Sequence, residues 1–172
     1  NIKSPNDFQK PCELAVRGLD ALLDYQNYPV IAAENATMYR RPIGVGIINL
    51  AYWLAKNDTN YSNPNLELVD EYAEAWSYYL IKASADLAVE QGQCPGTEQK
   101  ACIGIHETKY SKGITPNMTY KTDLDELIPH VERLPWDDLR KDLQEYGIRN
   151  STLMALMPAE TSAQISNATN GI

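Results

Sequence analysis

The chain has 172 residues, of which 44% are hydrophobic and 22% charged, and its formal net charge at pH 7 is −8. This length and composition suit one globular domain or a piece of a larger one. The negative charge argues against general nucleic-acid binding, because a protein that neutralises phosphates needs a basic face and the sequence has no basic cluster beyond Arg40 and Arg41. No apolar run approaches the roughly 20 residues that span a bilayer, so we expect no membrane segment.

The cysteines indicate the compartment. There are three of them, Cys12, Cys94 and Cys102, and the sequence has no signal-peptide pattern. An odd number without such a pattern favours a reduced, cytoplasmic protein. Several N-x-S/T sequons would invite glycans in a secreted protein, but we attribute them to the abundance of Asn and Thr.

The first third of the chain predicts a helix, a strand and another helix. Apolar residues spaced by three and four predict an amphipathic helix over 9–26, with Cys12 in the core and not a nucleophile. Residues 31–38 form a second short helical or irregular piece. An apolar β-rich run over 42–48 predicts a strand that leads into a helix over 50–55. Its two glycines, Gly44 and Gly46, suggest a dinucleotide fingerprint only weakly, because the third glycine is replaced by Asn49; close backbone packing explains them at least as well.

A long helix is predicted next. Asn63 and Pro64 resemble a helix cap followed by proline at the first helical position, and Gly92 ends the helix after Gln91. The adjacent Tyr78 and Tyr79 could suggest an electron relay, but neighbouring residues face different directions on a helix, so we expect one packed and one at the surface. The predicted buried stripe consists of Leu66, Val69, Ala73, Trp76, Leu80, Ala83 and Leu87.

Residues 93–113 are the least regular part and contain Cys94, Cys102 and His106. Their spacing fits no compact zinc pattern, and nothing in the sequence brings a cysteine and a histidine together as a nucleophile pair. We therefore predict no metal site. Residues 123–128 indicate a short helical turn, and 135–146 predict a helix that buries Trp136, Leu139 and Leu143.

The C-terminal stretch predicts strand, turn and helix. The apolar run 153–157 suits a short strand buried on both faces, and Pro158 ends it. Glu160, Thr161 and Ser162 are residue types that satisfy the free N–H groups at a helix N-terminus. Such a turn can bind an anion, and the alternative is an ordinary capped helix after a core strand.

Alternating strands and helices imply an α/β layout with parallel pairing. Two apolar strands cannot complete a sheet by themselves, so the chain looks like part of a larger fold. Unsatisfied strand edges would also favour pairing with another copy, so a homo-oligomer is possible.

Four blocks of sequence carry a resemblance to a known family. They cover residues 14–29, 40–56, 78–84 and 147–171, and the last block is highly specific. Over nearly its whole length the chain resembles the large, catalytic α subunit of class I ribonucleotide reductase, of the bacterial and T-even-like phage type. The resemblance implies an α/β fold, a helix-rich segment of the ten-stranded α/β barrel with a few parallel strands, in which residues 1–172 form a single partial domain.

The resemblance also implies a function. The family reduces ribonucleoside diphosphates to deoxyribonucleotides for DNA synthesis, and backbone amides and hydroxyls of one loop hold the substrate diphosphate. The matching residues are Pro158, Ala159, Glu160, Thr161 and Ser162. Ala159 stands where the family commonly has a hydroxyl residue, so one side-chain contact to phosphate is expected to be lost.

No catalytic residue of the family falls within the matched stretch. The radical cysteine, the reducing cysteine pair and their neighbours precede it, and the radical-relay tyrosines follow it. Cys94 matches a cysteine that is not catalytic. We expect the isolated chain to be inactive and to bind no cofactor or metal, whereas the full enzyme would use a radical-generating β subunit, a dithiol reductant and nucleotide effectors.

The expected partners are a ribonucleoside diphosphate, the remaining parts of the α subunit and the β subunit. The expected location is the cytoplasm, or the host cytoplasm if a phage encodes the chain. The alternative is a non-catalytic α/β remnant that folds without any activity of its own.

Overall fold

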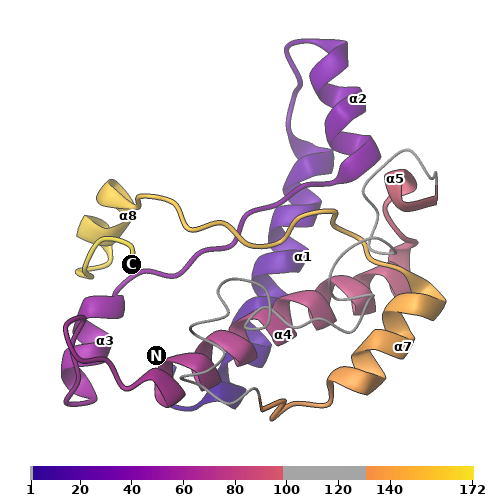
Figure 1. Cartoon of the computed structure of the whole chain (residues 1–172). Coiled ribbons are helices and arrows are strands. Elements are labelled where there is room, and N and C mark those ends of the chain that lie inside the picture. Colours follow the sequence, from indigo (N-terminus) through magenta and orange to yellow (C-terminus); the bar gives the residue numbers. More distant parts are fainter. Residues whose placement is uncertain (1, 99–130) are drawn as a thin grey trace.

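The computed structural model describes residues 2–98 and 131–172. A short 3-10 turn, η1 (Pro5–Phe8), leads into α1 (Gln9–Tyr25), and the chain then reverses into α2 (Ile31–Arg40). The predicted first helix is thus confirmed within a residue at each end. Figure 1 shows α2 projecting beyond the layer that α1 forms with the later helices.

Two helices follow the first extended segment. The first is α3 (Leu50–Lys56), and the second is the long α4 (Leu66–Gln91), which Gly92 ends with a positive φ of 86°. The side chain of Asn65, and not that of Asn63, caps α4 by accepting from the Leu68 N–H (3.1 Å). The predicted cap was two residues early because Asn60 Oδ1 accepts from the N–H groups of residues 62 and 63 and closes a separate turn there.

The remaining described helices are α5 (Pro95–Glu98), α7 (Trp136–Tyr146) and α8 (Glu160–Ile165). Gly147, with a φ of 74°, ends α7 as the sequence predicts. The helical turn predicted over 123–128 lies outside the described residues. Within the described ranges, no helix is long and apolar enough to cross a membrane.

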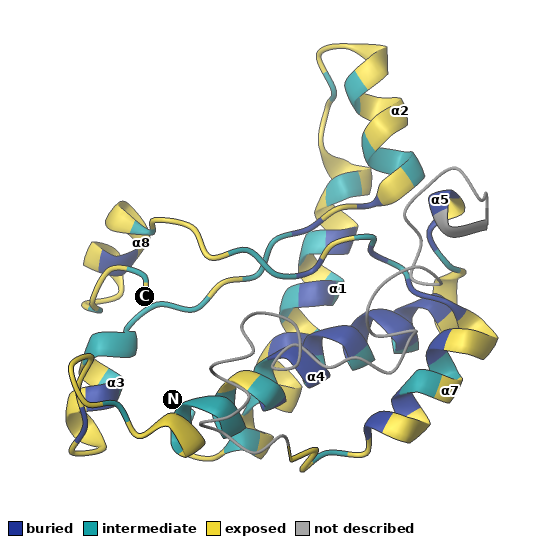
Figure 2. Cartoon of the chain, viewed as in Figure 1, coloured by how far each residue is buried: buried dark blue, intermediate teal, exposed yellow. Residues whose placement is uncertain are grey.

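The core lies where α4 is held between α1 and α7 (Figure 2). Because α4 is covered on two sides, its buried surface is wider than the single predicted stripe, and Ala75, Ile81 and Ala85 are also buried. Two residues of the predicted stripe, Leu66 and Ala73, were wrongly predicted to be buried, because both are exposed near the start of the helix. The principal core side chains are Cys12, Val16, Ile43, Tyr78, Leu80, Leu87, Trp136, Leu139, Leu143, Ile148 and Leu153.

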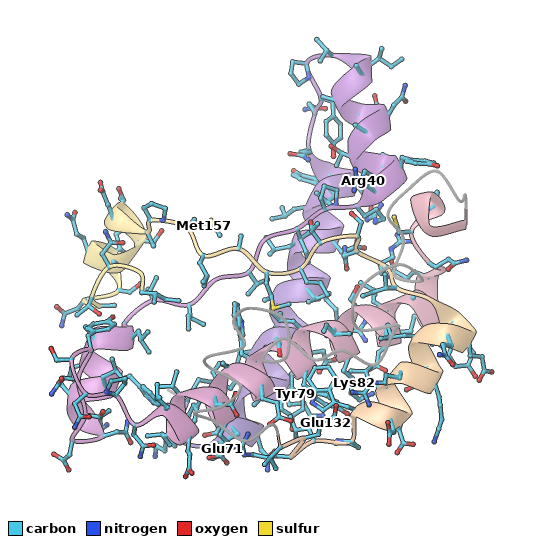
Figure 3. All side chains as sticks on the ribbon, in the orientation of Figure 1. Arg40, Glu71, Tyr79, Lys82, Glu132 and Met157 are labelled. Carbon is cyan, nitrogen blue, oxygen red and sulfur yellow. The ribbon has the colours of Figure 1, made fainter. Side chains whose placement is uncertain are left out.

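The adjacent tyrosines of α4 both contact the protein. Tyr78 is buried and packs edge to face on Trp136, with ring centroids 5.1 Å apart. Tyr79 is half-buried against the core, and its hydroxyl donates to Asn6 Oδ1 (3.0 Å). The prediction of one packed and one surface residue therefore holds for Tyr78 and only in part for Tyr79, which Figure 3 labels on α4.

The two predicted strands run side by side and parallel, joined by one bridge between Val45 and Met154. The prediction that 153–157 is buried on both faces was wrong, because Leu156 is 61% and Met157 49% exposed. The backbone hydrogen bonds between the two segments end at Ala155, and the next three residues are exposed. The described residues are rich in helix, with parallel pairing limited to this bridge, so the ten-stranded α/β barrel stays a prediction.

Candidate functional site

The parallel pair fixes the direction of the C-terminal stretch. The Val45 N–H donates to Leu153 O (2.8 Å), and the Ala155 N–H donates back to Val45 O (3.1 Å). A third bond runs from the Ile43 N–H to Thr152 O (3.1 Å). Both segments leave this pairing at the same end, one toward α3 and the other toward α8 (Figure 1). In α/β proteins, ligands bind at this carboxyl end of parallel strands.

Two glycines make the close approach possible. A Cβ added to Gly46 would lie 2.5 Å from Ala155 O, and one added to Gly44 would lie 2.9 Å from the Ala155 Cβ. Both distances are shorter than real Cβ contacts allow. The interpretation of these glycines as sites of close backbone packing is therefore confirmed.

The loop beyond the pair contains all five residues that the resemblance assigns to diphosphate. Pro158, Glu160, Thr161 and Ser162 are exposed, and Ala159 is half-buried. The N-cap of α8 is Ala159, and no side chain caps the helix. The prediction that the Glu, Thr and Ser side chains satisfy the N-terminal N–H groups was wrong, because these residues are the first three inside the helix and the cap position holds an alanine.

Three backbone donors are consequently open in this loop. The first hydrogen bond of α8 runs from the Ala163 N–H to Ala159 O (2.7 Å). The N–H groups of Glu160, Thr161 and Ser162 precede it and have no acceptor within the described chain. Pro158 has no N–H, and the Ala159 N–H already donates to Asn170 Oδ1 (2.8 Å). Donation to an anion would thus come from residues 160–162, together with the Thr161 and Ser162 hydroxyls.

Sequence reasoning missed two asparagines that hold this loop. Asn49 exchanges two hydrogen bonds with Thr169: its N–H donates to Thr169 O (3.0 Å), and its Oδ1 accepts from the Thr169 N–H (2.9 Å). Asn170 accepts from Ala159 at the start of the loop. The available signal was the position of Asn49 in place of the third fingerprint glycine, since its φ of 72° is a conformation that asparagine tolerates better than most residues.

A buried polar network lies at the opposite end of the parallel pair. The Arg41 Nε donates to Asp20 Oδ1 (2.7 Å), and Asn150 Nδ2 donates to the same oxygen (2.9 Å). Asn150 Oδ1 accepts from the Ser84 hydroxyl (2.9 Å). The second Asp20 oxygen accepts from Arg149 Nε (3.2 Å). Each of these charged groups is paired, so the network ties α1, α4 and the chain around 41 and 150 together instead of offering a reactive group.

Arg41 also reaches the surface through a fork with Asp24. Its Nη1 and Nη2 donate to the two Asp24 carboxylate oxygens at 2.9 and 2.7 Å. These hydrogen bonds lower the pKa of Asp24 below its ordinary value. Figure 3 labels the neighbouring Arg40, whose carbonyl accepts from the Ser151 N–H (3.0 Å) beside this network.

The other candidate side chains are placed as core residues. Burial raises the pKa of the Cys12 thiol to about 12, and burial is also the main reason that the pKa of Tyr78 rises to about 12. Cys94 is buried, and its Sγ donates to Tyr39 O (3.0 Å). Cys102 and His106 lie outside the described residues. In the described ranges, no three His, Cys, Asp or Glu side chains gather as a metal ion would require.

Comparison with known proteins identifies relatives over nearly the whole chain. A family model described as "Ribonucleotide reductase, barrel domain" matches residues 3–172. The chain is 56% identical over 159 residues to the ribonucleoside-diphosphate reductase subunit alpha of Haemophilus influenzae, covering 92% of this chain and 20% of the relative.

Two further relatives carry the same name. The subunit alpha from Buchnera aphidicola of Acyrthosiphon pisum is 48% identical over 172 residues, which cover 99% of this chain and 22% of the relative. The subunit alpha from Enterobacteria phage T4 is 46% identical over 159 residues, which cover 92% of this chain and 20% of the relative. The chain therefore spans about a fifth of the length of these relatives.

Proposed function

Since this chain belongs to the ribonucleotide reductase barrel-domain family, we propose that it is one partial domain, residues 1–172, of a ribonucleoside-diphosphate reductase α subunit. Its task there is to bind the diphosphate of the ribonucleoside diphosphate that the whole enzyme reduces to a deoxyribonucleotide. The residues that perform this task are Pro158, Ala159, Glu160, Thr161 and Ser162.

One observation carries the proposal: the N–H groups of Glu160, Thr161 and Ser162 are consecutive and have no acceptor in the described chain. They lie where a segment paired in parallel ends and a helix begins, on an exposed loop. Converging N–H groups at a helix start favour a negatively charged oxygen. The hydroxyls of Thr161 and Ser162 add two donors of the kind that phosphate oxygens accept.

The five residues contribute differently. The Glu160 carboxylate carries the same sign of charge as the substrate, so its contribution is the backbone N–H and not the side chain. Pro158 ends the extended segment, and Ala159 links it to α8 while its own N–H is held by Asn170. Thr161 and Ser162 alone offer both a backbone and a side-chain donor. They are therefore the residues whose replacement tests the proposal.

The chemistry of reduction belongs to other parts of the enzyme in this proposal. The described cysteines, Cys12 and Cys94, are buried, and the high pKa of Cys12 makes it a poor nucleophile at neutral pH. The radical-generating β subunit, the dithiol reductant and the nucleotide effectors would act on the remaining parts of the α subunit. The 172-residue chain by itself holds the substrate and does not reduce it.

Calorimetric titration of the chain with CDP and with inorganic pyrophosphate tests this function. Thr161→Ala and Ser162→Ala should each weaken binding about tenfold, the size expected for one hydrogen bond to a charged group. Ser166→Ala is the matched control, because Ser166 is an exposed residue at the other end of the same helix. Its affinity should equal that of the parent chain.

The titration distinguishes a diphosphate-binding segment from a non-catalytic remnant. Binding that both loop variants weaken supports a diphosphate site. No binding, or binding that neither variant changes, favours the non-catalytic remnant. In a second assay, the chain is mixed with the remaining parts of an α subunit and a β subunit. CDP reduction should then appear, and it should be absent from the chain alone.

A further inference from the structure

Apart from the covalent chain at Met157, the loop formed by residues 158–172 is hydrogen-bonded to the rest of the described protein through one residue. Of the described residues outside 158–172, only Asn49 hydrogen-bonds to this loop. It does so twice, because its N–H donates to Thr169 O (3.0 Å) and its Oδ1 accepts from the Thr169 N–H (2.9 Å). The two residues are 120 positions apart in the sequence.

The Asn49 side chain does not bond to the helix that it precedes, which is unusual for an asparagine at an N-cap position. Asn49 is the N-cap of α3, and its carbonyl accepts from the Trp53 N–H (3.0 Å). An N-cap asparagine commonly turns its side chain back onto its own helix. Asn49 makes no such bond, and it adopts a left-handed backbone with φ 72° and ψ 20°. Its side-chain oxygen is instead committed to a different segment of the chain.

The contact continues across the loop to Ala159, near its start. Asn170, next to Thr169, accepts from the Ala159 N–H through Oδ1 (2.8 Å). The two ends of the loop are thereby joined, and Asn49 connects the joined ends to the segment that contains Val45. The open N–H groups of residues 160–162 follow Ala159 directly. Among the described residues, Asn49 is thus the hydrogen-bonding link between this loop and the chain that follows Val45.

We propose that Asn49 is a positioning residue for the diphosphate loop. It acts through Thr169 and Asn170 to hold residues 160–162 at the carboxyl end of the parallel pair, and it does not touch the substrate. This inference rests on the proposed function of the loop. A loop already held in its binding conformation loses less freedom when it binds, so removal of the contact weakens binding without removing a donor to phosphate.

Asn49→Gly is the decisive variant, because glycine adopts the left-handed backbone readily and only the side-chain acceptor is lost. Asn167→Gly is its matched control: Asn167 is exposed in the same loop, has a φ of 51°, and its side chain makes no hydrogen bond to the described residues. Inorganic pyrophosphate is titrated into each 172-residue chain by calorimetry. Asn49→Gly should bind pyrophosphate at least about fivefold more weakly than the parent chain. Asn167→Gly should bind it with the same affinity as the parent chain.

Two further measurements distinguish positioning from general weakening. Amide hydrogen exchange should quicken at Ala159 and Thr169 in Asn49→Gly while the amides of α4 keep their rates. Asn49→Asp, which retains a side-chain oxygen, should restore slow exchange at Thr169. In a double-mutant cycle, Asn49→Gly and Thr161→Ala should be non-additive, because both act on the same contact with phosphate.

The two proposals can fail separately. If the parent chain binds no pyrophosphate, the proposed function fails and this inference fails with it. If the parent binds and Asn49→Gly binds equally well, only the positioning role is overturned. An equal loss of affinity in Asn167→Gly would also overturn it, since the loss would then follow from loosening the loop at any point.

Discussion

The Asn150 Nδ2 donates to Asp20 Oδ1 at 2.9 Å, and the two residues are 130 positions apart in the sequence. Both are almost completely buried, with 1% and 2% of their surface exposed. The second Asn150 amide hydrogen bond goes to Arg41 O (3.1 Å), and its Oδ1 accepts from Ser84. Every polar group of this side chain is therefore satisfied, and the C-terminal stretch is joined through it to α1 and α4.

Removal of the Asn150 side chain should destabilise the chain strongly. Asn150→Ala leaves the buried Ser84 hydroxyl and one buried Asp20 oxygen with fewer partners, and we expect a loss of about 2–4 kcal/mol. Urea unfolding followed by circular dichroism measures it. Asn35→Ala, an exposed change of the same kind on α2, should stay within about 0.5 kcal/mol. Equal effects of the two changes would contradict the role of the network.

Arg41 and Arg40 form a natural pair for a second test. Arg41 is 4% exposed and bonds to Asp20 and Asp24, whereas the Arg40 side chain is exposed. Arg41→Met removes the principal cation beside a buried carboxylate and should cost about 3–5 kcal/mol. Arg40→Met should cost less than about 1 kcal/mol, from its position near the end of α2. Denaturant midpoints of the two variants compare them directly, and similar midpoints would refute the prediction.

Gly46 should not tolerate a methyl group. In Gly46→Ala the new Cβ would lie 2.5 Å from Ala155 O, so the parallel segments must separate and hydrogen bonds between them are lost. Amide exchange at Val45 and Ala155 should quicken, with a loss of stability of about 1–3 kcal/mol. Gly18→Ala in α1 has nothing within 4 Å and should stabilise the chain by about 0.5–1 kcal/mol. The prediction is wrong if both variants change stability in the same direction.

The fork between Arg41 and Asp24 predicts a pH dependence. Hydrogen bonding to Arg41 lowers the pKa of Asp24 in the folded chain. The group therefore contributes stability above the ordinary aspartate value of about 3.9, and the contribution is lost as pH falls through the lowered folded value. The gap in unfolding free energy between the parent and Asp24→Asn should be widest near pH 7 and close at acid pH. Asp58→Asn removes a surface charge without breaking a described ion pair and serves as the control.

The helices could be predicted from sequence because their signals are local. The three-and-four spacing identified α1 and α7, and Gly92 and Gly147 marked two helix ends. The cap of α4 was predicted at Asn63 instead of Asn65, because only the structure shows that Asn60 closes a turn onto Asn63 and that the Asn65 side chain caps the helix. The width of the buried face of α4 could not be predicted either, because it depends on how many other helices pack against α4.

The residues that support the candidate site could not be predicted from the sequence. The resemblance pointed to residues 158–162, and the structure puts them on an exposed loop at the start of α8. Nothing in a single sequence pairs Asn49 with Thr169, which lie 120 residues apart. The apolar run 153–157 indicates burial without saying what covers it, and for this reason the exposure of Leu156 and Met157 could not be foreseen.

The long sequence separation within the buried network has a consequence for synthesis on the ribosome. Asp20 is translated 130 residues before Asn150, an interval on the order of ten seconds at ordinary rates of elongation. During that interval α1 can form, but its buried carboxylate lacks the Asn150 amide and the Arg149 guanidinium that later satisfy it. Until residues 149 and 150 have been translated, Asp20 therefore depends on Arg41 and on water for its hydrogen bonds.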